Sequence, residues 1–305
     1  MRNIQRLTVT LLAVLLLGGC AVPAGAPEAD GRVKVVATLF PQYDFARQIA
    51  GEHADVTLLL PPGVESHSYE PTPADIIRIN DADLFLYTGE YMEPWAEKIL
   101  AGVTGDVQAV DLSAHMTLEK DVDGDGHEHG GYDPHIWTDP QNAKVMVDDI
   151  AAALCAVDPE NAGEYRTSAA EYKEQLNVLD QAFAEVVETG KRREIVFGGR
   201  FALHYFAERY GLTCISAFDS CSSETEPSAK AVAEIIRAIE TDGIPVVYYE
   251  ELTDPKVARS IAEQTGAKPL LLHSCHNVST EELQNGATYL SLMGQNVENL
   301  REGLN

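Results

Sequence analysis

Short apolar runs alternate with helical patterns along most of this 305-residue chain, beginning at residue 33. The first run, 33–38, has the length of a buried strand, and a helical pattern follows it over 42–51. Because alternating strands and helices build parallel sheets with helices on both faces, this order predicts an α/β fold. The eight expected strands lie at 33–38, 55–60, 84–88, 107–112, 195–198, 213–217, 245–249 and 269–272.

One long helical pattern interrupts this alternation. Residues 158–190 are mostly polar, with apolar residues at helical spacing, and the alternation of strands and helices restarts after them. A helix of that length can run along a whole lobe, because it rises ~1.5 Å per residue. We therefore expect an N-terminal βα lobe over 33–157, a linking helix over 158–190 and a C-terminal βα lobe over 191–305.

Two helix starts carry capping signals. Asp139 is a natural N-cap and precedes a proline that fits the first helical turn. Ser279 is followed three residues later by Glu282, a capping box that predicts the start of the last helix. The stretch before Asp139, residues 113–138, is expected to be a loop.

The N-terminus has the pattern of a bacterial lipoprotein signal. Arg2 and Arg6 precede the apolar stretch 7–17, which is too short to cross a bilayer that needs ~20 residues. Small residues then lead to Cys20, as in the lipobox, in which the cysteine is lipidated and becomes the new N-terminus. We expect a signal peptide over 1–19, a flexible tether over 20–32 and an extracytoplasmic protein held on the cell membrane by its lipid. A plain signal peptide with an incidental cysteine is the alternative.

The charge balance excludes one class of partner. The chain has 22 Lys and Arg against 48 Asp and Glu, a formal net charge of −26. Proteins that bind nucleic acid through a general basic surface gain affinity by neutralising phosphates, so no nucleic-acid partner is expected. The acidity is compatible with a cationic ligand and equally with simple solubility.

Four cysteines remain besides Cys20, and none of them forms a CxxC motif. An even number of cysteines outside the cytoplasm favours disulfides, with three possible pairings. We expect Cys221 to pair with Cys275, because both follow predicted strands of the same lobe. Buried free thiols are the alternative. The other two cysteines are Cys155 and Cys214.

Histidines occupy loops near predicted strand ends. His67 follows the second strand, His135 follows the fourth, and His273 and His276 follow the last. Because open parallel sheets bind ligands beyond the carboxyl ends of their strands, these imidazoles are expected to meet in the cleft between the lobes and hold a metal ion. Nearby acids could accept the ring N–H groups: Glu65 or Glu70 for His67, and Asp133 for His135.

The segment 121–130 combines three aspartates with His127, Glu128 and His129. Its start imitates a calcium-binding EF-hand loop, but Tyr132 stands at the twelfth position, where a bidentate Glu is needed. We therefore expect no calcium site. The glycine-rich composition predicts a mobile loop, which either captures metal near the cleft or is only a solvated linker.

Several motifs together resemble the zinc and manganese solute-binding lipoproteins of bacterial ABC transporters. They are the lipobox, GVESHSYEPTPADI, the acidic His-containing loop, DPHIWTDP, RFALHYFAERYGL and GATYLSLMGQN. The resemblance covers nearly the whole mature chain. It implies two βα lobes joined by a rigid helix, with a divalent metal held between them and passed to a membrane permease and its ATPase. The protein itself is expected to be a monomer.

The resemblance also implies a ligand set. His67 and His135 fall on the family's first two ligand positions, and His273 falls on the fourth, usually Asp. Three neutral imidazoles favour Zn²⁺ over Mn²⁺, which prefers oxygen ligands. We therefore expect zinc at His67, His135 and His273.

The family's third ligand position, usually His or Glu, falls on Arg200, which stays protonated and cannot ligate. Its charge at ~5 Å from a divalent cation would cost about 7 kcal/mol at an effective dielectric constant of ~20. Arg200 is therefore expected to turn away or to pair with an acid. The candidate acids are Glu224, Glu226, Glu250 and Glu251, and the missing ligand could be His204, a glutamate or water.

Two other functions are compatible with the same residues. A zinc hydrolase also uses three protein ligands and an open position, and Glu250 or Glu251 could act as its base, although HExxH is absent. A surface adhesin would use the lipid anchor to display the protein to other cells. We expect a binding protein rather than an enzyme.

Overall fold

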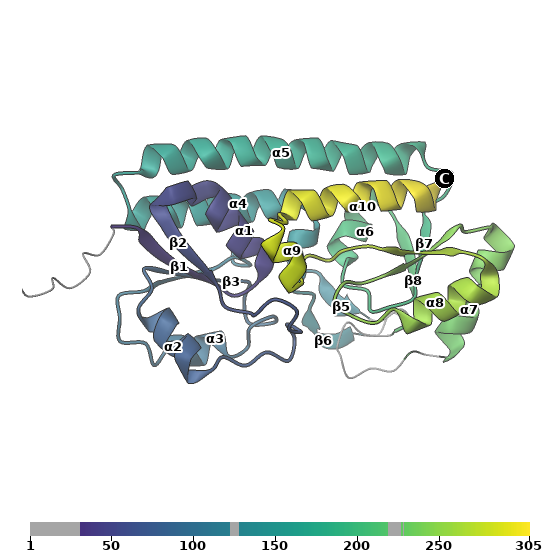
Figure 1. Ribbon diagram of the computed structural model, residues 1–305, viewed down its shortest axis with the longest axis horizontal. Coiled ribbons are helices and arrows are strands. Elements are labelled where there is room, and N and C mark those ends of the chain that lie inside the picture. The colour runs from purple at the N-terminus through teal and green to yellow at the C-terminus, as the bar shows by residue number, and fades with distance from the viewer. Residues whose placement is uncertain (1–30, 123–127, 219–226, 228) are drawn as a thin grey trace, which may run out of the picture. The chain divides into compact units, whose positions relative to one another are not determined.

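The computed structural model describes residues 31–122, 128–218, 227 and 229–305. The eight predicted strands form two four-stranded parallel sheets, which confirms the predicted α/β fold with two lobes (Figure 1). The N-terminal sheet has the order β2-β1-β3-β4 and the C-terminal sheet the order β10-β9-β7-β8. Their strands are β1 Val33–Ala37, β2 Ala54–Leu58, β3 Leu84–Tyr87, β4 Gln108–Asp111, β7 Glu194–Phe197, β8 Thr213–Ser216, β9 Val246–Tyr249 and β10 Lys268–Leu271.

The central strands are apolar on both faces because helices cover both. In β1, Val35 pairs with Val56 and Leu84 and packs into the main core, whereas Val36 packs into a smaller core on the opposite face. Strand β9 follows the same rule, with Val247 facing away from the main core. This two-sided burial explains why these strands are mostly apolar in the sequence, with the exposed Lys34 as the exception in β1.

Ten α-helices accompany the sheets in the described part of the chain. Helix α5 confirms the predicted long helix between the two sheets. The helices are α1 Phe40–Ala50, α2 Pro73–Asn80, α3 Ala96–Leu100, α4 Pro140–Val157, α5 Ala162–Thr189, α6 His204–Tyr210, α7 Ala229–Asp242, α8 Lys256–Thr265, α9 Thr280–Gln284 and α10 Tyr289–Leu304.

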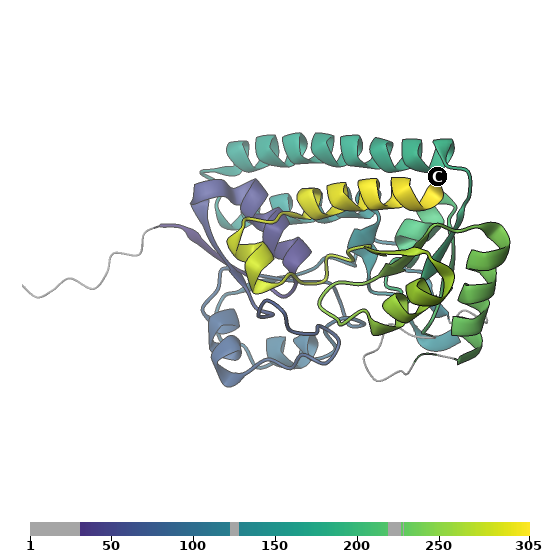
Figure 2. The same cartoon turned by 45° about the vertical axis from the view of Figure 1, so that its right-hand side comes forward.

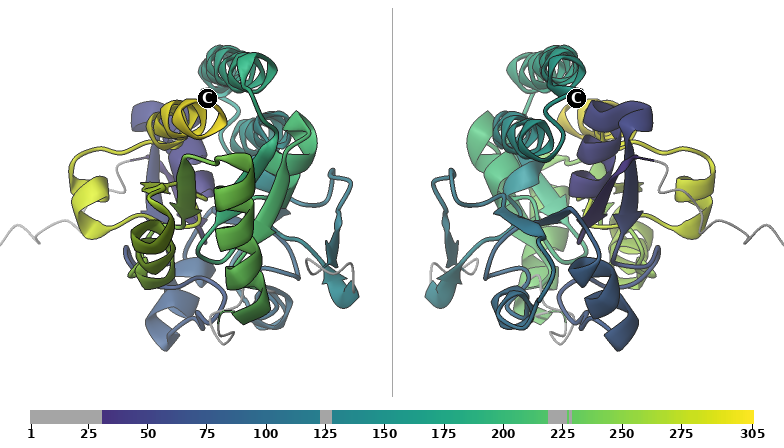
Figure 3. Two further views of the ribbon diagram at one scale, coloured as in Figure 1. Left: turned by 90° about the vertical axis from the view of Figure 1, so that its right-hand side faces the viewer. Right: turned by 90° about the vertical axis from the view of Figure 1, so that its left-hand side faces the viewer.

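One large core serves both sheets. Helix α5 extends over the N-terminal sheet at one end and the C-terminal sheet at the other, with α10 beside it (Figures 1 and 2). The views in Figure 3 look along these two helices and show them adjacent. Apolar side chains from β1, β3, β7 and β9 and from the helices beneath α5 join in a single cluster. The predicted lobe boundaries at 157 and 191 stay predictions.

Local differences from the predicted elements concern the last helix and the loop 113–138. The capping box of Ser279 and Glu282 is present, but α9 ends at Gln284. Gly286 then adopts a left-handed φ of 75°, and Thr288 caps a separate helix, α10. The segment 113–138 contains a hairpin of β5 (Lys120–Val122) and β6 (Glu128–Tyr132), followed by the 3-10 turn Ile136–Thr138.

The predicted disulfide is not supported. Cys275 is a buried free thiol, and Cys155 and Cys214 are also free. Cys221 lies outside the described residues, as does Cys20. Burial raises the pKa of the Cys275 thiol well above its usual range, so Cys275 stays protonated and packs as a small apolar side chain.

No helix in the described part of the chain is both long enough and apolar enough to cross a membrane.

A buried acid ties together the ends of β1 and β3. The carboxylate of Glu93 accepts hydrogen bonds from the main-chain nitrogens of Thr88, at 3.0 Å, and Gly89, at 3.2 Å, and from the Thr38 hydroxyl. Burial raises the pKa of Glu93 to about 7 despite these three donors. The neutral acid is therefore the form that this part of the fold favours.

The folded protein should lose stability as Glu93 ionises. The pKa of Glu93 is higher in the folded state than in the unfolded chain. The stabilisation that the neutral acid provides is therefore complete below pH 4.5 and is lost as the pH rises through about 7. Between pH 4.5 and 8, ionisation of Glu93 should lower the free energy of unfolding of the wild-type protein by about 3 kcal/mol. Glu93→Gln, which imitates the neutral acid, should not show this decrease. Urea unfolding at both pH values measures it.

The exposed Glu97, on α3, offers a control. Glu97→Gln should leave the pH dependence of the wild-type protein unchanged. If the free energy of unfolding changed with pH equally in the wild-type protein and in Glu93→Gln, the raised pKa of Glu93 would be contradicted.

Candidate metal centre

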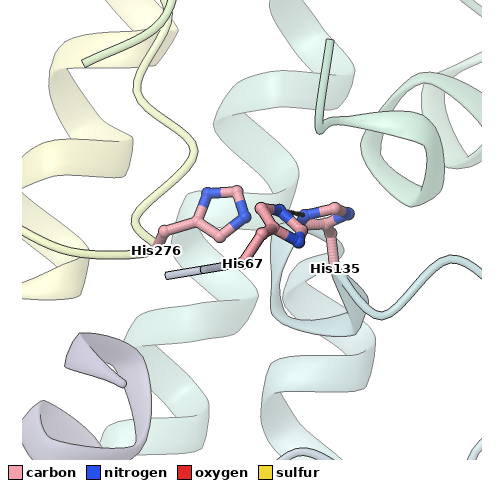
Figure 4. A group of neighbouring side chains, drawn as sticks. All are labelled: His67, His135 and His276. Atoms are coloured by element: carbon pink, nitrogen blue, oxygen red, sulfur yellow. Dashed lines mark hydrogen bonds between the residues drawn. The ribbon is translucent and has the colours of Figure 1, made fainter. Parts of the chain in front are cut away.

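Three histidines from distant parts of the chain meet in one group (Figure 4). His67 lies in the loop after β2, His135 immediately before the turn that leads into α4, and His276 in the loop after β10. One ring nitrogen from each lies within 4.8 Å of the other two. The ring centroids of His135 and His276 are 4.4 Å apart, and both rings stand edge-on to His67.

Asp133 fixes the orientation of His135. Its Oδ1 accepts the main-chain N–H of His135 at 2.8 Å and pairs with Nδ1 of the same residue. Since a carboxylate only accepts, Nδ1 carries the ring proton and Nε2 presents a lone pair. This confirms the predicted pairing of Asp133 with His135. Burial alone would raise the pKa of Asp133, but the neighbouring His135 lowers it to about 2.

A hydroxyl and a carboxylate fix His276 in the same way. The Ser274 hydroxyl donates to Oε1 of Glu251 and contacts Nδ1 of His276. With its own proton on Glu251, this hydroxyl accepts from the His276 Nδ1–H, which leaves a lone pair on Nε2. Glu251 is buried, which opposes ionisation, but the neighbouring His273 and His276 and the hydrogen bond from Ser274 lower its pKa overall.

The free nitrogens point at one another. His67 Nε2 lies 3.3 Å from His135 Nε2, and His276 Nε2 is buried with no hydrogen-bond partner. Two nitrogen ligands on one tetrahedral zinc ion, each at ~2.0–2.1 Å, would lie about 3.3 Å apart. A buried lone pair without a donor is costly unless a cation meets it. The donor set therefore fits a small divalent ion.

The three imidazoles are held in the neutral form that a metal needs. Burial and the neighbouring His276 lower the pKa of His67 to about 4. Burial also lowers the pKa of His135, which Asp133 only partly offsets, and burial together with His135 lowers that of His276. Neutral nitrogen donors at neutral pH suit zinc better than manganese.

The loop that carries His276 is hydrogen-bonded to the N-terminal lobe. Asn277 donates through Nδ2 to the carbonyls of Pro61 and Val64, at 2.7 and 2.9 Å, within the loop that carries His67. The Trp137 indole N–H donates to the Ser274 carbonyl at 2.7 Å. Further main-chain bonds run from Phe40 N to His276 O and from Gly63 N to Val278 O. The three histidines thus share one rigid support.

The structure places His273 outside this group. Its main chain exchanges two hydrogen bonds of 2.8 Å with the Asn296 side chain on α10. Its ring accepts the Cys275 N–H at Nδ1 and lies between Glu251 and Glu282, at 3.6 and 3.7 Å. The structure therefore brings His67 and His135 together with His276, whereas the sequence-based prediction chose His273.

Which of these two histidines joins the metal group depends on the turn between them. Cys275, between the two histidines, has a left-handed φ of 63°, and only His276 contributes a nitrogen to the three-histidine group. No residue type at this position signals that turn, because glycine or asparagine is the usual choice for positive φ. The sequence located the loop, but nothing in it identified the inward-facing histidine.

Arg200 pairs with Glu250, one of the four acids considered as its partner. Its main-chain nitrogen and Nε lie 3.1 and 3.3 Å from the Glu250 carboxylate. A side chain at Gly199 would collide with that carboxylate, so this glycine gives Glu250 room to reach Arg200. His204 opens α6, with its ring against Phe201, and does not join the three-histidine group.

Other predicted acids have different roles or fall elsewhere. Glu65 accepts the main-chain N–H groups of His67 and Ser68 rather than the His67 ring. Glu224, Glu226 and His127 lie outside the described residues. Glu128 and His129 belong to β6 rather than to a loop.

Comparison with known proteins points to one family. The family model described as ZnuA, zinc-uptake complex component A, periplasmic, matches residues 35–303. The chain is 33% identical to the high-affinity zinc uptake system protein ZnuA of Bacillus subtilis, over 96% of this chain and 94% of that protein. It is 32% identical to the zinc-binding lipoprotein AdcA of Streptococcus pneumoniae, of which it spans 61%.

A solved structure of the Zn(II)-bound ZnuA-like domain of Streptococcus pneumoniae AdcA superposes on this chain with a TM-score of 0.77. The two are 32% identical, and the match covers 90% of this chain and 99% of that domain.

The attachment of the His276 loop can be tested at Asn277, whose side chain is fully buried. Asn277→Ala leaves the carbonyls of Pro61 and Val64 without their donor and should lower the free energy of unfolding by about 3 kcal/mol. Denaturant unfolding measures the change. Asn299→Ala is the control: it removes one hydrogen bond to Leu271 O and an exposed one from Gln295, and should cost about 1 kcal/mol. Equal losses in the two variants would contradict the role given to Asn277.

Proposed function

Because the chain belongs to the family of periplasmic zinc-uptake complex components, we propose that it binds Zn²⁺ through His67, His135 and His276 and delivers the ion to an ABC permease. The observation that carries the proposal is the convergence of three neutral imidazoles on one point, with His276 Nε2 buried and unpartnered. Zinc accepts such nitrogen ligands at tetrahedral corners. The names of the relatives, a high-affinity zinc uptake protein and a zinc-binding lipoprotein, agree with it.

Preorganisation supports tight binding. Asp133 and Ser274 already hold two of the rings with Nε2 turned inward, and Asn277 fixes the loop of the third ligand against the first. Little conformational freedom then remains to be lost when the ion arrives. Partners that hold ligating imidazoles in position typically contribute 10–100-fold to metal affinity.

The family consists of transport components and not of enzymes. We therefore assign the acids near the site to support rather than catalysis. Glu251 receives both hydrogen bonds of Ser274, from its main-chain nitrogen and its hydroxyl, and Glu250 is held by Arg200. Both carboxylates thus stabilise the loops that surround the site.

His276→Ala should weaken zinc binding by at least about 100-fold, because it removes a direct ligand rather than a supporting partner. His273→Ala is the matched variant, since both histidines lie in the same loop, and it should change the affinity far less. Competition titration against a chromophoric zinc chelator measures both, and thermal unfolding of the metal-free variants checks that each is folded. A larger loss in His273→Ala would restore the ligand set predicted from the sequence.

We also propose that Cys20 carries the lipid that holds the protein, as a monomer, on the outer face of the cell membrane. The signal pattern before Cys20 and the lipoprotein named among the relatives support this. Full-length protein made in a bacterial host should enter the detergent phase of a Triton X-114 extract. Cys20→Ser should shift it to the aqueous phase, and a wild-type protein found there would contradict lipidation.

A further inference from the structure

The three-histidine group leaves one side for another ligand. His135 is fully buried, whereas His67 and His276 line a pocket that also contains Arg200, Glu250 and Glu251. Zinc held by three protein ligands normally takes a fourth at the open position. Among the described residues, the metal-competent group has three members only. The fourth ligand would therefore enter from the pocket.

The carboxylates around this pocket are already engaged. Glu65, Glu250 and Glu251 each accept two hydrogen bonds, all at 3.3 Å or less. No oxygen of these acids belongs to the group of ligand atoms that lie within 4.8 Å of one another. Each acid would have to move to reach the ion, and its hydrogen bonds oppose that movement. The donors are His67 N and Ser68 N for Glu65, Arg200 N and Nε for Glu250, and Ser274 N and Oγ for Glu251.

Among the described residues that line this pocket, Arg200 is the one cation. Its Nε is used by Glu250, but in the part of the chain that the structure describes its two terminal nitrogens have no hydrogen-bond partner. A guanidinium presents five N–H donors in a planar fork that suits anions. Arg200 is also close enough to His67 for its positive charge to act on that imidazole.

These charges set a condition on the fourth ligand. Zinc bound by three neutral imidazoles keeps its full double charge. The Arg200 guanidinium pairs with Glu250 through Nε and presents its two terminal nitrogens in the same pocket. A neutral water would leave the charge of the zinc ion uncompensated by its ligands, whereas an anion offsets part of that charge and also accepts from the terminal N–H groups of Arg200. Charge-assisted hydrogen bonds from a guanidinium are also stronger than those between neutral groups.

We propose that a small monovalent anion, a halide or a carboxylate, completes the zinc site by binding both the ion and the Arg200 guanidinium. The proposal rests on the proposed function, because it needs zinc at the three histidines. The protein then carries zinc as an ion–anion pair. Arg200 cannot itself be a ligand, but its positive charge favours an anion as the fourth ligand.

Cobalt(II) offers a direct probe, because its visible absorption bands depend on the identity of its ligands. The full chain is loaded with Co²⁺ in a chloride-free buffer of weakly coordinating perchlorate and titrated at constant ionic strength with chloride or acetate. The expected result is a saturable spectral shift. The two titrations distinguish a halide from a carboxylate as the preferred ligand.

Arg200→Gln should weaken the anion affinity by about tenfold, since it removes the charge and the fork. Arg200→Lys, which keeps the charge, should lie between this variant and the wild-type protein. Arg259→Gln is the control, because Arg259 pairs with Asp254 on the exposed surface. The anion affinity of that variant should equal that of the wild-type protein.

Two results would overturn the proposal. One is a wild-type cobalt spectrum that neither anion changes, and the other is an unchanged anion affinity in Arg200→Gln. Failure of the proposed function looks different, because His276→Ala would then bind cobalt as tightly as the wild-type protein and give the same spectrum. The wild-type titration decides the matter even if an Arg200 variant does not fold.

Discussion

The hydrogen bonds from Asn277 to Pro61 and Val64 join two loops that are more than 200 residues apart in the sequence. One loop carries His67 and the other His276, so the geometry of the metal group depends on this junction. Trp137 extends it, because its indole binds the Ser274 carbonyl and its own carbonyl accepts the Tyr289 hydroxyl. Asp44 in turn receives the first N–H of α10, at Tyr289. The metal group is thus continuous with the helical framework.

The two lobes contribute different parts of the site. Although His276 follows a strand of the C-terminal sheet, its loop is fastened to the N-terminal lobe, as are the segments carrying His67 and His135. The C-terminal sheet contributes the opposite wall, where Arg200 and Glu250 follow β7 and β9. Nitrogen ligands therefore lie on one side of the pocket and an ion pair on the other.

Local sequence signals were sufficient for the architecture but not for the full site. Runs such as 33–38 identified the strands because burial on both faces demands continuous apolar residues, and Asp133 lay close enough in sequence to His135 for their pairing to be anticipated. The facing of His276 depends on a positive φ at Cys275 and on contacts of Asn277 with a remote loop. Neither the positive φ nor the contact with a remote loop produces a periodic or compositional pattern in the sequence. The break between α9 and α10 was missed because one glycine, Gly286, does not by itself end a helical pattern.

The large core beneath α5 also bears on how the molecule folds. Strands of both sheets place side chains in that core, Val35 from one and Tyr248 from the other, with Phe183 of α5 among them. Neither lobe could keep its inner face covered if the chain were divided between the sheets, because each would expose apolar surface that the other now buries. We therefore expect the two lobes to unfold as one cooperative unit.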